Sequence, residues 1–112
     1  MTSIDRTTFD ELRQISGAEF MDELIDTFLD DAPGMVRQMK SALETGDADS
    51  FRRAAHSMKS NAATFGAGTL AELAKELETL GRENRLAEAG DRLAALEAAV
   101  ASACSELGEL KS

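Results

Sequence analysis

The chain has 112 residues, 43% of them hydrophobic, which is enough for one domain with a packed core. Its 21 acidic residues outnumber its 12 basic ones and leave a formal net charge of -9, so nucleic acid is excluded as an expected partner. There is no apolar run of membrane-spanning length, no secretory-type apolar segment at the N-terminus, and only one cysteine, Cys104. We therefore expect a soluble cytoplasmic protein without disulfides or membrane contact.

A short first helix is predicted over about residues 4–15, ending near Gly17, with Thr7 or Thr8 as the candidate N-cap. Its apolar positions are Ile4, Phe9, Leu12 and Ile15. We expect this helix to cover one end of the fold.

A long amphipathic segment covers residues 18–44 and contains the only proline, Pro33. The apolar period continues from Phe20 to Leu43 without a break in phase, so one kinked helix is favoured over two separate helices. Gly46 then marks the end of this helix, and Asp47 or Ser50 is expected to cap the next one.

Three further helices are predicted over about residues 48–65, 68–81 and 85–110, the last with apolar residues at heptad spacing. Four long amphipathic segments joined by short loops predict an all-α fold, an antiparallel up-down four-helix bundle with a short extra N-terminal helix. We expect residues 1–112 to form a single domain with its core bundle at about 18–110, and the chain to be a complete small protein.

The segment Phe51–Gly66 holds the only histidine, His56, inside an acid-free run from residue 50 to residue 71. On a helix, His56 lies about 140° from the apolar seam that includes Phe51, so its ring should face solvent. Arg52 and Lys59 lie one turn to either side, and nearby cations disfavour the protonated imidazole. The ring is therefore expected to be neutral and nucleophilic near neutral pH, although an ordinary surface histidine would show the same pattern.

A metal site is not expected, because one histidine and one distant cysteine provide no ligand spacing. A Ser-His-Asp or Cys-His nucleophile is equally unsupported, since the histidine lies on a helix with no strand-loop framework around it. The sequence also lacks a glycine-rich phosphate loop and a metal-holding Asp-Phe-Gly motif, which argues against a kinase.

Residues 55–67, AHSMKSNAATFGA, resemble the signature of histidine-containing phosphotransfer (HPt) domains, which is A-H-x-L-K-G/S followed by small residues and an apolar-Gly-Ala ending. The resemblance extends over about residues 20–96. It includes Phe28-Leu29-Asp30-Asp31-Ala32-Pro33, Gly46-Asp47, Leu70, Leu73, Leu77-Glu78 and Gly81-Arg82. Met58 replaces the usual Leu and Ser60 the commoner Gly; both changes conserve size well enough for packing and for access by a partner.

The resemblance implies that His56 accepts a phosphoryl group from an aspartyl phosphate of a receiver domain and relays it to another response regulator. It implies that Lys59 adds positive charge beside the phosphoryl oxygens, and that Glu78 either hydrogen-bonds the imidazole or is a solvated helix residue. The residues implied in partner docking are Arg52, Arg53, Ser60 and Ala63, although Arg52 and Arg53 could equally be solvated.

By the same resemblance the protein is a monomeric phosphocarrier without kinase activity or a cofactor of its own, and Mg²⁺ belongs to the partner receiver. Its partners would be receiver domains of response regulators or a hybrid histidine kinase. Two alternatives remain open. One is an adaptor that binds receivers or kinases without carrying phosphate, and the other is an unrelated helical protein that dimerises through its C-terminal seam.

Overall fold

The structure is a computed structural model that describes residues 4–111. The first three residues and Ser112, on which the expectations about targeting and completeness partly depend, lie outside this range. The described residues form α-helices and one 3₁₀ turn, without strands. The elements are α1 (Arg6–Ser16), α2 (Ala18–Thr45), α3 (Ala48–Thr64), α4 (Gly68–Arg82), η1 (Leu86–Glu88) and α5 (Gly90–Leu110).

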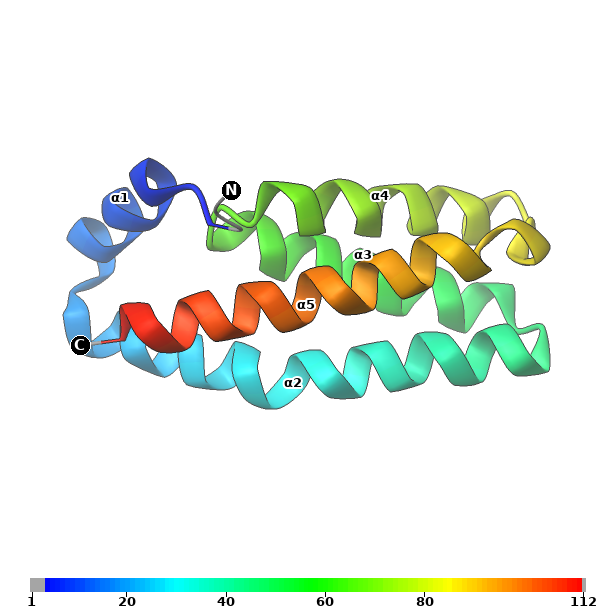
Figure 1. The fold of residues 1–112 in the computed structure, drawn as a ribbon, viewed down its shortest axis with the longest axis horizontal. Helices are drawn as coiled ribbons and strands as arrows, with labels where there is room; N and C mark the ends of the chain where they lie inside the picture. Colours follow the sequence, from blue (N-terminus) through cyan, green and yellow to red (C-terminus); the bar gives the residue numbers. More distant parts are fainter. Residues whose placement is uncertain (1–3, 112) are drawn as a thin grey trace.

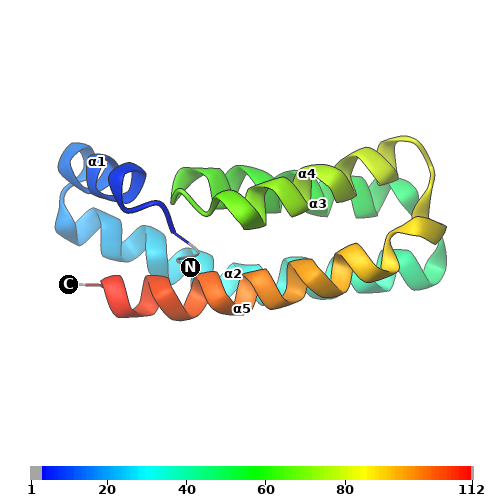
Figure 2. The same cartoon turned by 45° about the horizontal axis from the view of Figure 1, so that its top comes forward.

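Helices α2 to α5 lie side by side along the 41 Å long axis, and each runs in the opposite direction to the one before it (Figure 1). Helix α1 crosses the end of α2 at one end of this bundle (Figure 2). The prediction of an all-α fold is confirmed. None of the described helices combines the length and the apolar character of a membrane-spanning segment.

The ends of α2 and α3 follow the local signals in the sequence. Helix α2 passes through Pro33 as one helix, as predicted, and stops at Gly46, which has a left-handed φ of 74°. Asp47 caps α3, because its carboxylate accepts a hydrogen bond from the backbone N–H of Ser50. The predicted threonine cap of α1 is wrong: Asp5 caps this helix by accepting from the backbone N–H of Thr7.

The core contains the apolar seam of every long helix, and the α3 seam from Phe51 through Met58 to Phe65 is buried. Two residues of the predicted apolar pattern are instead exposed, Ile15 to 84% and Phe20 to 52%. Ile15 lies about 120° around α1 from the buried Phe9, and only one face of α1 meets the bundle. Phe20 lies in the first turn of α2, which extends beyond the ends of α3 and α4 (Figure 2).

The last helix was predicted to start near residue 85, but α5 starts at Gly90. Asn84 adopts a left-handed φ of 57°, which ends the preceding helical path. Arg85 then donates hydrogen bonds to Glu83 and Glu88 across the turn that contains η1. The leucine spacing does not show that this segment is a 3₁₀ turn. Leu86 packs against the core from this turn, as it would from the first turn of an α-helix.

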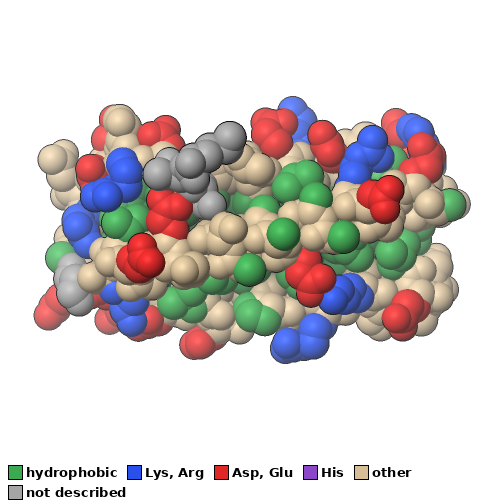
Figure 3. Space-filling view, in the orientation of Figure 1, with side chains coloured by type: hydrophobic (Ala, Val, Ile, Leu, Met, Phe, Trp, Pro, Cys, Tyr) green, Lys and Arg blue, Asp and Glu red, His purple; other side chains and the backbone are tan. Residues whose placement is uncertain are grey.

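The apolar seam of α5 is used inside the bundle. Its buried residues are Leu93, Leu96, Val100, Ala103 and Leu107. On the face that α5 presents in Figure 3, apolar side chains form only scattered patches between acidic and basic ones. These seam residues are therefore already engaged in packing within the chain.

Candidate phosphoacceptor site

The imidazole of His56 lies on the outer side of α3, whereas its neighbours Ala55 and Met58 are buried. Its side chain is 56% exposed, as the helical period predicted. The small residues predicted for docking, Ser60 and Ala63, are also exposed, one and two turns further along the helix. A macromolecule can therefore approach the ring from this side.

Glu78 reaches the imidazole from α4. Its Oε2 lies 2.7 Å from His56 Nδ1, and its Oε1 accepts a 2.6 Å hydrogen bond from Lys59 Nζ. The Glu78 side chain is only 5% exposed, so the alternative of a solvated helix residue is wrong. Lys59 is likewise not a freely solvated lysine, since its side chain is 32% exposed and paired with this carboxylate.

The protonation of Glu78 determines which ring nitrogen of His56 is free. Burial raises the pKa of Glu78, but the hydrogen bonds from Lys59 and His56 outweigh burial and hold this pKa below its ordinary value. An ionised carboxylate only accepts hydrogen bonds, so Nδ1 must carry the proton that it shares with Oε2. In the neutral ring Nε2 then has a free lone pair on the exposed side.

The acid-free run around His56 in the sequence does not keep carboxylates away from the ring in space. Residues 50–71 contain no acid, but Glu78 lies 22 positions further along the chain and packs against the ring from the next helix. The prediction of a neutral imidazole considered only the neighbouring cations Arg52 and Lys59. It therefore left out Glu78, the charged group that contacts the ring.

Helices α3 and α4 approach each other closely one turn from this hydrogen bond. A Cβ at Gly81 would lie 3.1 Å from the backbone N and Cα of Arg52, which is tighter than ordinary contact. Glycine at this position lets the two helix backbones meet. Because Gly81 follows Glu78 by one turn and Arg52 precedes His56 by one turn, this contact also sets the separation of the carboxylate and the ring.

The two arginines predicted for docking are both held by Asp49. Arg52 Nη2 donates a 3.0 Å hydrogen bond to Asp49 Oδ1, and Arg53 donates to the other oxygen of the same carboxylate. Arg52 lies against α4, whereas Arg53 is 72% exposed and lines a depression next to α2. Both guanidinium groups are therefore engaged by Asp49 and not by Glu78, the carboxylate that contacts the imidazole.

Arg82 is a residue of this cluster that the sequence reasoning did not select. Its Nη2 lies 3.4 Å from Glu78 Oε2, and its side chain is 62% exposed. Its position four residues after Glu78, directly after the helix predicted over about residues 68–81, was the available signal. Three donors, from His56, Lys59 and Arg82, thus converge on one carboxylate.

The family model described as Hpt domain matches residues 23–106, well over half of the chain. The chain belongs to the Hpt domain family. A crystal structure of histidine-containing phosphotransfer protein B (HptB) from Pseudomonas aeruginosa PAO1 matches with a TM-score of 0.89 and 30% sequence identity, covering 96% of this chain and 92% of that one. A sequence comparison with curated proteins finds no match.

Membership of the Hpt family assigns the chain to histidine phosphotransfer in phosphorelays. Proteins of this family are phosphocarriers, not kinases, carry no cofactor of their own, and interact with receiver domains and kinases. Within residues 4–111, no group of three or more His, Cys, Asp or Glu side chains is arranged to hold a metal ion.

Proposed function

We propose that His56 accepts a phosphoryl group from the aspartyl phosphate of a receiver domain and passes it to a second response regulator. The observation that carries this proposal is the 2.7 Å hydrogen bond between His56 Nδ1 and Glu78, which leaves Nε2 as the free nitrogen of an exposed ring. In this proposal residues 1–112 act as one Hpt domain, with α2 to α5 as the core bundle and α1 as its cover.

In the transfer step the Nε2 lone pair attacks phosphorus, and the bond from phosphorus to the aspartyl oxygen breaks. The aspartate leaves with the bonding electron pair as a carboxylate, and the imidazole carries the phosphoryl group on Nε2 while Nδ1 keeps its proton. Positive charge develops on the ring during attack, and the Glu78 carboxylate stabilises it. The same path run backwards transfers the group to another receiver.

Lys59 and Arg82 supply positive charge next to the reacting nitrogen. Both cations contact Glu78 in the unphosphorylated protein, and each has an exposed portion from which it can reach phosphoryl oxygens. The receiver's own carboxylates and Mg²⁺ would neutralise the remaining charge of the loose phosphoryl transition state. Ser60 and Ala63 keep the surface beside the ring low enough for a receiver to approach.

The test is a transfer assay with a purified receiver domain carrying radiolabelled aspartyl phosphate. The expected result is label on this chain that is stable to alkali and labile to acid, and that is lost in His56→Gln. Receiver binding without such label would refute the proposal in favour of an adaptor, and absence of both binding and label would refute any role with the receiver tested.

A further inference from the structure

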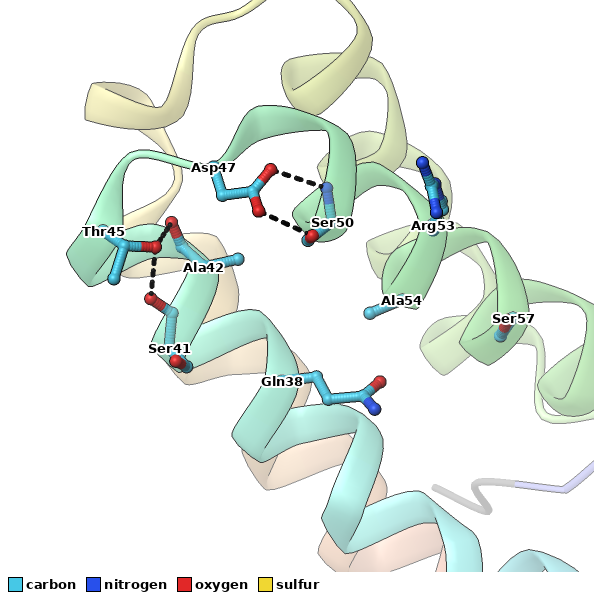
Figure 4. Close-up of a pocket in the computed structure, with 9 residues that line it drawn as sticks. All are labelled: Gln38, Ser41, Ala42, Thr45, Asp47, Ser50, Arg53, Ala54 and Ser57. Carbon is cyan, nitrogen blue, oxygen red and sulfur yellow. Dashed lines mark hydrogen bonds between the residues drawn. The ribbon is translucent and has the colours of Figure 1, made fainter.

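A polar groove runs between α2 and α3 beside the phosphoacceptor. It consists of two adjoining depressions of about 420 and about 370 Å³, which share Gln38 of α2 and Ser57 of α3. Figure 4 shows the first depression, with Gln38 extending from α2 toward α3. Ser57 directly follows His56 on α3, so one wall of the groove lies within a single helical turn of the phosphoacceptor.

The charged side chains at one end of the groove already have partners within the described part of the chain, whereas Asp31 at the other end does not. At one end, Asp47 is bonded to Ser50 and Arg53 is paired with Asp49. At the other end, two exposed carboxylates, Asp30 and Asp31, line the depression, and Asp31 has no ion pair among the residues that the structure describes. The charge in the groove that remains open to a partner is therefore negative.

This lining selects among occupants. A phosphate-like anion is disfavoured, because the only cation in the first depression is already neutralised by Asp49 and the carboxylate of Asp47 lies beside it. An apolar helix fits less well, because it would leave the carboxylate of Asp31 and the hydroxyl and amide groups of the lining without partners. A polar segment of protein with a positively charged side chain satisfies both the hydrogen-bonding groups and the open carboxylate.

We propose that this groove is a specificity element for receiver docking. It accepts an extended loop of the receiver that carries a lysine or arginine, and Asp31 pairs with that cation. The proposal rests on the proposed function, because it identifies which receivers are positioned for transfer to His56. Receivers without a cation at this place would dock with lower affinity and transfer more slowly.

The experiment measures phosphotransfer from a panel of purified receiver domains, each phosphorylated with acetyl phosphate, to the full chain and its variants. Asp31→Lys is compared with Glu44→Lys, which makes the same change in net charge at an exposed position of α2 that lines neither depression. For the best receiver, Asp31→Lys is expected to lower kcat/KM about tenfold and Glu44→Lys less than about twofold. The difference should shrink as the salt concentration rises to about 0.5 M.

Phosphoramidate, a small phosphodonor that needs no docking surface, separates this proposal from the proposed function. Asp31→Lys should be labelled by phosphoramidate as fast as the unmodified chain. Equal loss of receiver transfer in Asp31→Lys and Glu44→Lys, or none in either, would refute the groove proposal while leaving the phosphoacceptor role intact. Failure of every form to be labelled on His56 would refute the proposed function itself.

Discussion

Replacing Glu78 by alanine removes the group that holds the His56 ring in one tautomer. The carboxylate accepts from Nδ1 at 2.7 Å, and no other described hydrogen bond engages this ring. Without it, both tautomers are open to the ring, and the one with the proton on Nε2 has no lone pair on that nitrogen with which to attack phosphorus. We therefore expect Glu78→Ala to remain folded but to accept phosphate more slowly.

The size of this effect follows from the strength and exposure of the hydrogen bond. Hydrogen bonds to charged groups contribute about 1.5–3 kcal/mol net, and the ring of His56 is 56% exposed, so we take the lower end. A preference of about 1.4 kcal/mol corresponds to a tenfold ratio of tautomers. If its loss leaves the two tautomers equally populated, the reactive fraction falls from about nine-tenths to about one half, so tautomer population alone predicts a transfer rate about twofold lower. Glu78→Gln keeps an oxygen that accepts from Nδ1, so its tautomer should be retained and its rate should fall less.

The measurement combines two observables on ¹⁵N-labelled protein. Long-range proton–nitrogen NMR distinguishes a protonated Nδ1 from a bare one, and the labelling assay gives the transfer rate from a phosphorylated receiver. Glu72→Ala serves as the control, because Glu72 is an exposed carboxylate on the same helix. The reasoning is refuted if Glu78→Ala keeps its proton on Nδ1, or if the tautomer changes and the rate does not.

Gly81→Ala should lower the free energy of unfolding by about 1 kcal/mol in urea titrations, because the strain of a methyl group 3.1 Å from the Arg52 backbone exceeds the gain in helix propensity. Gly108→Ala, where nothing lies within 4 Å, should instead stabilise the protein, and similar results for the two would contradict the close contact. Asp47→Ala removes the N-cap of α3 and should cost about 1 kcal/mol, checked by thermal unfolding against Asp47→Ser, which retains a cap. The pKa of Glu78 lies below its ordinary value of 4.5, so its stabilising contribution is complete above that pH and is lost as the pH falls through the lower folded-state pKa. Unfolding titrations from about pH 7 to about pH 3 should therefore show a steeper loss of stability in the unmodified chain than in Glu78→Gln, and parallel curves would contradict the shift.

The faces and ends of individual helices could be predicted from the sequence. The apolar period of Phe51 through Phe65 predicted both the buried side of α3 and the exposure of His56, because helical geometry relates neighbouring residues without reference to the rest of the chain. The stop at Gly46 was predicted for the same reason, and Asp47 was one of the two predicted caps of α3, since each feature depends on the conformation of a few adjacent residues. The motif around His56 also indicated the family.

The environment of the histidine was decided by tertiary packing. Glu78 meets His56 across two helices whose separation depends on Gly81, and no local pattern specifies that distance. Packing likewise left Ile15 and Phe20 exposed, because an apolar side chain is buried only where another element covers it. Sequence by itself thus determined most of the helices and the exposure of the His56 ring. The tertiary structure decided which nitrogen of that ring is free, because hydrogen-bond partners 22 residues apart are brought together only by the packing of α3 on α4.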